Sequence, residues 1–312
     1  MKYGLMSGLL WALDTTILSI ALAMSPYGSG LAEAIAFAAI VSSAFHDMLC
    51  GVWMTVYMGV KGRLRQALMA VKTRSGIVVA IGALLGGPVG MTGYVMAINL
   101  IGPAYTAIIS AFYPAFGTIL SALVLKEKVT PPRVVALFAA MLGIAGMSFA
   151  TIGSSELSSP VLGIACALLC VIGWGSEAVF CAWGMRDEAV DNESALFIRE
   201  VTSGLTYGIL VLPLFGAWSF GIKALPTPAT GVIAAAAIAG VASYLFYYKG
   251  IGVIGAARGM ALNISYSAWA VLFGAVLLGA TSSAWEVVCC VVILVGTVLS
   301  ATDWNELRGR AE

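Results

Sequence analysis

Two short segments of the sequence place an aromatic ring three residues before a carboxylate. Trp11 precedes Asp14 and Trp174 precedes Glu177, each inside a long apolar stretch. Residues three apart share a helix face, so each segment would present its ring and its carboxylate together. A carboxylate attracts an ammonium group, and a ring adds apolar area and cation–π attraction of ~0.5–2 kcal/mol. The pairs predict a binding site for a substrate with an ammonium group and an apolar part; alternatively, the acids only hydrogen-bond neighbouring helices.

His46 and Asp47 form a second polar pair within an apolar stretch, and His46 is the only histidine. A histidine titrates close to cellular pH, so this pair could act as a proton relay. The alternative is a neutral histidine that pairs with Asp47 or with a backbone carbonyl. We favour this alternative, because a single histidine is not by itself a relay.

Tyrosines recur at matching places in the two halves of the chain. A tyrosine packs against an apolar substrate while its hydroxyl offers a hydrogen bond. Together with the two ring and carboxylate pairs, they give a candidate set of substrate-binding residues: Trp11, Asp14, Tyr94, Tyr113, Trp174, Glu177, Tyr247, Asn263 and Tyr266.

The sequence offers little to an enzyme or to a nucleic-acid partner. It contains no H-E-x-x-H, no P-loop and no G-x-S-x-G, so we expect no catalysis, no cofactor and no ATP-driven pumping. A balance of 16 basic against 15 acidic residues lacks the basic surface that phosphate binding needs. The six cysteines all fall in apolar runs and lack zinc-site spacing, so we interpret them as packing residues.

The elements that position these residues are predicted to be membrane-spanning helices. Hydrophobic residues make up 61% of the chain and charged residues 10%, with a mean hydropathy of +0.99, whereas soluble domains carry about 25% charged residues. Only helices or closed barrels satisfy the backbone in lipid, and apolar runs of about 20 residues exclude a barrel. We expect an all-α integral membrane protein with ten spans: Tyr3–Ala23, Ala34–Val60, Gly76–Leu100, Ala104–Leu125, Val134–Ile152, Val161–Gly184, Ala195–Phe215, Ala229–Gly250, Gly255–Leu278 and Trp285–Thr302.

The first span could be mistaken for a cleaved signal peptide, because it ends in Ala21-Leu22-Ala23. We expect it to be retained, since it is close to full spanning length and its Trp11/Asp14 pair recurs later in the chain. Basic residues concentrate after spans 2 and 4, whereas the connections after spans 1, 3 and 5 have none. The positive-inside rule then places both chain ends in the cytoplasm.

A repeat relates the two halves of the chain. A shift of 153 residues superposes Gly102 on Gly255, Tyr94 on Tyr247 and Tyr113 on Tyr266, and it places His46-Asp47 on Arg199-Glu200. A shift of 163 superposes Trp11 on Trp174 and Asp14 on Glu177. Coincidence among Gly- and Ala-rich helices is the alternative explanation. We predict two five-helix repeats, residues 1–153 and 154–312, and an odd number of spans inverts the second, as in many secondary transporters.

These features resemble the drug/metabolite transporter superfamily, EamA type. The resemblance rests on the two halves, on the Trp11-Ala12-Leu13-Asp14 and Trp174-Gly175-Ser176-Glu177 segments, and on Gly102-Pro103-Ala104 through Tyr113-Pro114 to Lys126-Glu127. Within the superfamily the chain is most similar to YddG-type exporters of aromatic and other amino acids. Two departures put exact symmetry in doubt, because Gly279-Ala280 replaces an acidic turn and Ser267 replaces the counterpart of Pro114.

The resemblance implies a secondary transporter of the bacterial inner membrane that exports amino acids by alternating access. Its cavity would be bounded by spans 1, 3, 4, 6, 8 and 9. A single chain contains both halves, so we expect it to function as a monomer whose partners are a small-molecule substrate and lipid. Efflux of lipophilic cationic compounds is the alternative within transport. A membrane-bound enzyme or sensor is the alternative outside it.

Overall fold

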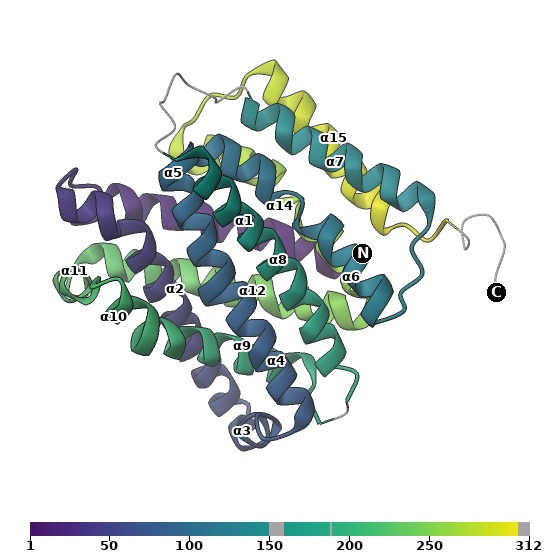
Figure 1. The fold of residues 1–312 in the computed structure, drawn as a ribbon, viewed down its shortest axis with the longest axis horizontal. Coiled ribbons are helices and arrows are strands. Elements are labelled where there is room, and N and C mark those ends of the chain that lie inside the picture. The colour runs from purple at the N-terminus through teal and green to yellow at the C-terminus, as the bar shows by residue number, and fades with distance from the viewer. Residues whose placement is uncertain (150–158, 188, 305–312) are drawn as a thin grey trace.

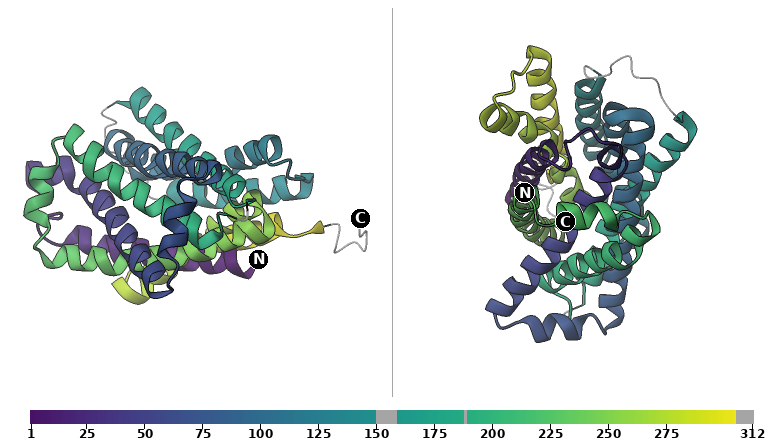
Figure 2. Two further views of the ribbon diagram at one scale, coloured as in Figure 1. Left: turned by 90° about the horizontal axis from the view of Figure 1, so that it is seen from below. Right: turned by 90° about the vertical axis from the view of Figure 1, so that its left-hand side faces the viewer.

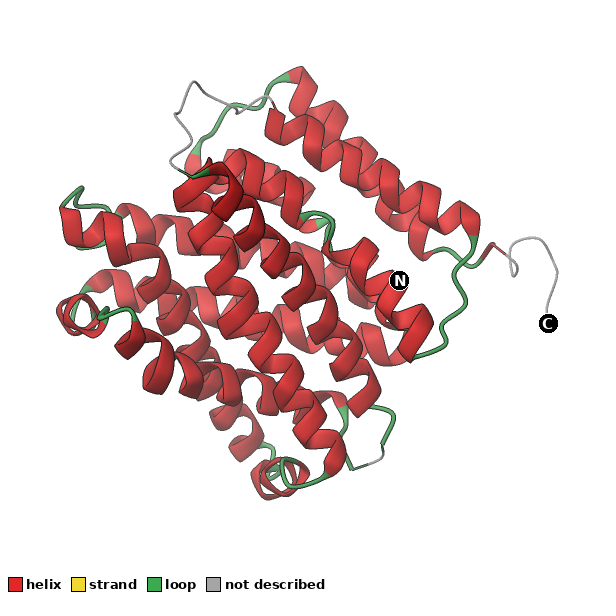
Figure 3. Cartoon of the chain, viewed as in Figure 1, coloured by secondary structure: helices red, strands yellow, loops and turns green. Residues whose placement is uncertain are grey.

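Every regular element in the described part of the chain is a helix, which confirms the all-α prediction (Figures 1 and 3). The computed structural model describes residues 1–149, 159–187 and 189–304. The first half contains α1 (Lys2–Ala23), α2 (Ala32–Val60), α3 (Leu64–Ala70), α4 (Arg74–Leu84), the π-helix η1 (Leu85–Met91), α5 (Thr92–Ser110), α6 (Tyr113–Val124) and α7 (Pro131–Phe149). The second half contains α8 (Pro160–Gly184), α9 (Asn192–Thr206), the π-helix η2 (Tyr207–Val211), α10 (Leu212–Leu214), α11 (Trp218–Ala224), α12 (Pro228–Ile254), α13 (Ala256–Asn263), α14 (Tyr266–Leu278) and α15 (Ala284–Ala301).

The helices supply ten membrane crossings. Nine helical stretches in the described residues are long and apolar enough to span a bilayer, and α6 is a shorter apolar helix. One of the nine, Arg74–Ser110, has 37 residues, far more than the ~20 that one crossing needs. A break at Gly102 divides it, so that its second part joins α6 to complete the fourth crossing.

The third and eighth crossings end at glycines that adopt the same unusual backbone conformation. Gly102 has φ 80° and ψ 164°, and Gly255 has φ 90° and ψ 162°. This region is accessible essentially to glycine alone. The two positions are related by the 153-residue shift, so the repeat found in the sequence also exists in the backbone.

A second break divides the crossings that follow. α5 gives way to α6 at Ala111 and Phe112, and α13 gives way to α14 at Ile264 and Ser265. Each of the predicted spans Ala104–Leu125 and Gly255–Leu278 therefore contains a break, and Ala256–Leu278 is still one stretch that is long and apolar enough to cross a bilayer. Each break leaves a tyrosine at the start of the following helix, where its side chain can face the centre of the bundle.

The helices of the two halves pack in equivalent ways, so the pairs of contacting helices stay the same when the halves are exchanged. α1 packs against α12, and the corresponding helices α8 and α5 pack against each other. α7 pairs with its counterpart α15 along one edge of the bundle, and α2 pairs with α9; Figures 1 and 2 show the bundle from three sides. Each half therefore covers the other, as a two-fold relation requires. The predicted boundary between residues 153 and 154 lies outside the described residues and stays a prediction.

The start of α1 and the end of α15 lie at the same side of the bundle. The Lys249 ammonium lies 4.9 Å from the centre of the Tyr3 ring at the start of α1. Arg258 Nη2 donates a 2.7 Å hydrogen bond to Asp303 Oδ2 just beyond α15. Since Lys249 and Arg258 flank the α12–α13 connection, the start of α1 and the end of α15 meet there. We call this end of the bundle the termini side and the opposite end the far side.

Basic connections gather at the termini side. Glu127, after α6, accepts a hydrogen bond from the backbone N–H of Ala256. Arg186, after α8, donates to the Leu125 carbonyl at 2.7 Å. Arg63, after α2, forms an ion pair with the N-cap residue of α9. The positively charged connections after the second and fourth crossings thus share one end of the bundle, as the sequence predicted.

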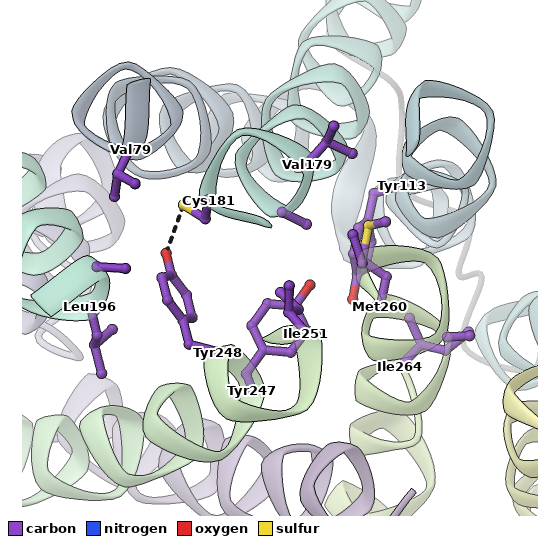
Figure 4. Packing of buried hydrophobic residues seen from close by; sticks show 14 of the residues in the cluster. Val79, Tyr113, Val179, Cys181, Leu196, Tyr247, Tyr248, Ile251, Met260 and Ile264 are labelled. Carbon is purple, nitrogen blue, oxygen red and sulfur yellow. Dashed lines mark hydrogen bonds between the residues drawn. The ribbon is translucent and has the colours of Figure 1, made fainter. Parts of the chain in front are cut away.

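A large apolar cluster occupies the middle of the bundle (Figure 4). In it the Tyr248 hydroxyl and the Cys181 thiol are 3.1 Å apart. Met260, fully buried, lies beside Tyr113. All six cysteines are free, in line with their interpretation as packing residues.

Candidate functional site

A cavity lies between the two halves, and most of the side chains that line it are aromatic. Six helices contribute to its wall: α1 and α6 from the first half, and α8, α12, α13 and α14 from the second. The lining residues are Trp11, Tyr113, Trp174, Glu177, Ala178, Ser243, Tyr244, Tyr247, Asn263 and Tyr266.

Seven of the nine predicted substrate-binding residues lie in this wall, so the structure brings most of the set together. Tyr94 stands behind it, with its ring centre 5.2 Å from that of Trp174. Asp14 does not line the cavity, and its carboxylate bonds His46 instead. The ring of Trp11 therefore faces the cavity without the carboxylate three residues later, and a direct role of Asp14 toward substrate stays a prediction.

Aromatic rings form two related groups across the cavity. Trp11 packs edge-on against Tyr266, with ring centres 6.5 Å apart. Trp174 packs edge-on against Tyr113, with ring centres 5.7 Å apart. The repeat exchanges these two pairs. Trp11 also packs edge-on against Tyr244 at 5.2 Å. Such edge-to-face contacts hold the rings in fixed positions around an empty space.

Neutral polar groups complete one part of the wall. The Tyr113 hydroxyl donates a 3.2 Å hydrogen bond to Asn263 Oδ1, and Asn263 Nδ2 donates to Ser7 Oγ at 2.7 Å. Ser243 Oγ donates to the Ser7 carbonyl at 2.9 Å. These bonds connect α1, α6, α12 and α13 and orient the Asn263 amide at the break before α14.

A buried network of charged groups begins where Glu177 meets the cavity. Arg199 Nε donates to Glu177 Oε1 at 3.0 Å. Its Nη1 donates to Glu200 Oε2 at 2.8 Å, and its Nη2 donates to the Tyr244 hydroxyl at 3.1 Å. The guanidinium carbon also lies 4.5 Å from the centre of the Tyr244 ring. Arg199 thus ties the cavity wall on α8 and α12 to α9.

The network continues from Arg199 into the first half. Arg199 Nη1 lies 3.5 Å from Asp47 Oδ2, which also accepts a 2.5 Å hydrogen bond from Ser203. Asp47 Oδ1 lies 3.5 Å from His46 Nδ1, and His46 Nε2 lies 2.9 Å from Asp14 Oδ1. His46 therefore bridges two carboxylates. The predicted pairing of His46 with Asp47 is present, and the shorter contact is with Asp14.

Glycines make room for this network. A Cβ atom on Gly86 would lie 1.5 Å from Glu177 Oε2, and one on Gly87 would lie 2.1 Å from Ser203 Oγ. A Cβ atom on Gly240 would lie 3.0 Å from His46 Nε2. η1 carries Gly86 and Gly87, so the widened turn of the π-helix lies where α8 and α9 bring their polar groups. π-helical turns are frequent at functional sites.

Arg199 and Tyr244 are the functional candidates that sequence reasoning missed, whereas Glu200 is one of the four acids that the sequence places inside spans. A signal was present for Arg199, because the 153-residue shift places Arg199-Glu200 on His46-Asp47. Tyr244 gave no such signal, since it stands three residues before Tyr247 without a matching aromatic in the first half.

Contacts between α6 and α13 join the two halves on the termini side. Met260 packs on Gly117, where a Cβ atom would lie 2.4 Å from its sulfur. The Glu127 carboxylate accepts hydrogen bonds from the N–H groups of Ala256 at 2.7 Å and of Ala257 at 3.1 Å. It thereby caps α13 and holds it to the end of α6.

The residues at the repeat-related positions on the far side cannot form the same contacts. The counterpart of Met260 is Ala107, and the counterpart of Glu127 is Ala280. A methyl group neither fills the volume of a methionine nor accepts a hydrogen bond. The Gly279-Ala280 departure noted in the sequence is thus a missing helix cap.

Comparisons with known proteins agree with this architecture. The profile of the EamA-like transporter family matches residues 1–149 and 161–302. Protein LicB of Haemophilus influenzae is 32% identical over 202 residues, which span 64% of this chain and 66% of the length of that protein. A protein of known crystal structure superposes on 96% of this chain and 95% of its own with a TM-score of 0.70. At 19% identity that likeness shows the fold alone. Because the family match covers nearly the whole chain in two consecutive segments, this multi-pass membrane protein belongs to the EamA-like transporter family.

Proposed function

We propose that the chain is a secondary transporter whose central cavity carries a small organic cation, such as a quaternary ammonium ion. The observation that supports this substrate class is the composition of the cavity wall. Six aromatic side chains surround one carboxylate, that of Glu177, and no Lys or Arg is among the lining residues that the structure describes. Aromatic cages of this kind are the usual receptors for quaternary ammonium groups.

The state of Arg199 favours a cation over a zwitterion. Arg199 is the cation nearest to the cavity, and its donors are directed to Glu177, Glu200 and Tyr244. A substrate carboxylate would have to displace one of these partners and would leave a buried carboxylate uncompensated, which is costly. A cation needs no such exchange, because Glu177 and the ring faces already attract positive charge.

A neutral amino acid, exported by alternating access, is the second candidate. The observation in its favour is that the Asn263 amide and the Ser243 hydroxyl also line the cavity. Both groups can donate hydrogen bonds to a substrate carboxylate while Glu177 attracts the ammonium group. The rings suit an aromatic or apolar substrate side chain equally well.

We place the termini side in the cytoplasm of a bacterium, with the chain in the inner membrane. The basic residues after α2 and α6 support this orientation through the positive-inside rule. A protease added to intact spheroplasts is then expected to spare an epitope tag attached to the C-terminus. Cleavage of that tag in intact spheroplasts would contradict the orientation.

Transport is tested with the purified protein in liposomes. Labelled choline, a small quaternary ammonium ion, and labelled phenylalanine are offered separately to vesicles loaded with the unlabelled compound. We expect rapid counterflow of choline and little of phenylalanine. Counterflow of phenylalanine alone would favour the amino-acid candidate. Saturable binding of either compound without flux would reject transport and indicate a sensor or an enzyme.

Two cavity variants test the site. Trp11→Leu and Trp174→Leu each remove one ring from the wall, and the loss of ~0.5–2 kcal/mol of cation–π attraction corresponds to an increase of about 2- to 30-fold in the half-saturating choline concentration. Trp285→Leu is the matched control, because Trp285 is exposed on α15, away from the cavity. Unchanged half-saturation in both cavity variants would reject the assignment of the site.

A further inference from the structure

The buried network contains more acid than base. Four carboxylates and two basic groups are each at most 8% exposed and lie in one chain of contacts between 2.8 and 3.5 Å: Asp14, His46, Asp47, Glu177, Arg199 and Glu200. When all six are ionised, four negative charges face two positive charges, which leaves a net charge of −2. Uncompensated charge in the interior of a membrane protein is strongly unfavourable. The network therefore requires further positive charge.

One oxygen of the Glu200 side chain indicates where part of this positive charge binds. Glu200 is completely buried. Its Oε2 accepts the bond from Arg199, whereas its Oε1 has no hydrogen-bond partner in the described residues. A buried, ionised carboxylate oxygen without a hydrogen-bond partner is strongly unfavourable. A proton on the Glu200 carboxyl removes one unit of that negative charge.

The missing charge is a proton rather than a metal ion. The described residues contain no group of three or more His, Cys, Asp or Glu side chains arranged to hold a metal. The ionisable groups that face Glu200 are His46, Asp47 and Cys50 on α2, Arg199 on α9 and Tyr244 on α12. Such a set shares protons readily through its hydrogen bonds.

Arg199 connects this proton to the cavity. The same guanidinium bonds Glu177, which lines the cavity, and Glu200, which does not. A cation that enters the cavity neutralises Glu177 and weakens its hold on Arg199. The charge of Arg199 then favours the ionised form of Glu200, so the O–H bond of the protonated carboxyl breaks and its proton leaves to solvent.

We infer that Glu200 is the proton-binding site of this transporter and that Arg199 makes its protonation and cation binding at Glu177 mutually exclusive. The coupling rests on the proposed function, whereas the protonation of Glu200 does not. Because one proton leaves when one monovalent cation binds, the total charge of the network and its bound ion is the same in the two states. The reverse step, in which the cation leaves, returns Arg199 to Glu177 and a proton to Glu200.

The protonation is tested without any substrate. Infrared spectra of the purified protein in lipid report protonated carboxyl groups through their C=O stretch. We expect such a band at neutral pH in the wild type, its loss on titration to alkaline pH, and its reduction by Glu200→Gln. Glu33→Gln is the control, because the side chain of Glu33 is exposed and pairs with Lys223 at the protein surface. The absence of a carboxyl band from the wild type would overturn the inference even if Glu200→Gln fails to fold.

The coupling is tested by adding choline to the protein in a weakly buffered solution that contains a pH indicator. The wild type is expected to release about one proton per bound choline, and Glu200→Gln is expected to bind choline without releasing protons. In liposomes, a difference of one pH unit then sustains an about tenfold choline ratio in the wild type. Glu200→Gln loses this accumulation and keeps choline counterflow.

The outcomes separate the two proposals. Choline binding without proton release by the wild type overturns the coupling and leaves transport of the cation intact. A carboxyl band at Glu200 without choline binding rejects the proposed substrate and supports the proton site. Release of bound ²²Na⁺ on addition of choline, in place of protons, overturns the proton site.

Discussion

The conformation of Gly255 and its contact with Glu127 predict a specific non-additive effect of mutation. Gly255 has a positive φ of 90°, and a Cβ atom there would lie 2.9 Å from the Glu127 carboxyl carbon. Gly255→Ala therefore introduces backbone strain of about 1–3 kcal/mol. It also displaces the carboxylate that caps α13, which removes about 0.5–2 kcal/mol more. The expected destabilisation is roughly 1.5–5 kcal/mol from these two contributions.

The repeat supplies the matched control. Gly102 has nearly the same φ and ψ, and a Cβ atom there would meet nothing within 4 Å. Gly102→Ala should then cost only the strain of about 1–3 kcal/mol. In a Glu127→Ala background the carboxylate that caps α13 is already absent. The cost of Gly255→Ala in that background should fall by about 0.5–2 kcal/mol, because no carboxylate remains to be displaced.

Equilibrium unfolding of the purified variants in mixed micelles, followed by tryptophan fluorescence, measures these differences. Gly102→Ala and Glu127→Ala share no contact, so their effects should add within about 0.5 kcal/mol. The reasoning is refuted if Gly255→Ala costs the same with and without Glu127, or if Gly102→Ala is neutral.

Three further substitutions have defined outcomes. Gly86→Ala places a methyl group 1.5 Å from Glu177 Oε2, so Glu177 must move and choline counterflow in liposomes should be lost. Met260→Ala empties a fully buried position and should lower the free energy of unfolding by about 2–5 kcal/mol; a loss below 1 kcal/mol would show that α6 and α13 collapse onto the space. The pKa of Asp187 lies below its usual value because the backbone N–H of the second residue after it and the Ser75 hydroxyl donate to its carboxylate. A lowered pKa gives stability that is present at neutral pH and lost as the pH falls through the folded pKa. Ser75→Ala should therefore reduce the difference in melting temperature between neutral and acidic pH, and an unchanged difference would contradict the role of this bond.

The number, order and ends of the spans were predictable because lipid imposes a simple rule. An apolar run of about 20 residues has one stable conformation in a bilayer, and the ends of α1, α2, α8 and α15 lie within two residues of the predicted ones. The breaks before Tyr113 and Tyr266 were not predictable by that rule. Both segments stay apolar through the break, and hydropathy does not report the proline at position 114 that ends the preceding helix.

The part of the candidate site that the sequence predicted is formed by residues whose type alone indicates that they line a cavity. Trp11 and Trp174 are large rings in the middle of spans, and both face it. The partners of the acids were harder to predict, since Asp14 and Glu177 occupy related positions but bond different bases, His46 and Arg199. Which base an acid reaches depends on helix rotation, and hydropathy does not report rotation.

Because of the alanines at positions 107 and 280, separating the helices costs a different free energy on the two sides of the bundle. On the termini side, separation of α6 from α13 breaks the Met260 packing and the Glu127 cap; on the far side, no equivalent contact has to break at these alanines. For the transport that we propose, we expect the empty carrier to rest predominantly in one orientation, and we expect the half-saturating substrate concentration to differ between the two faces of the membrane. Substitution of Ala280 by glutamate would bring these two concentrations closer together.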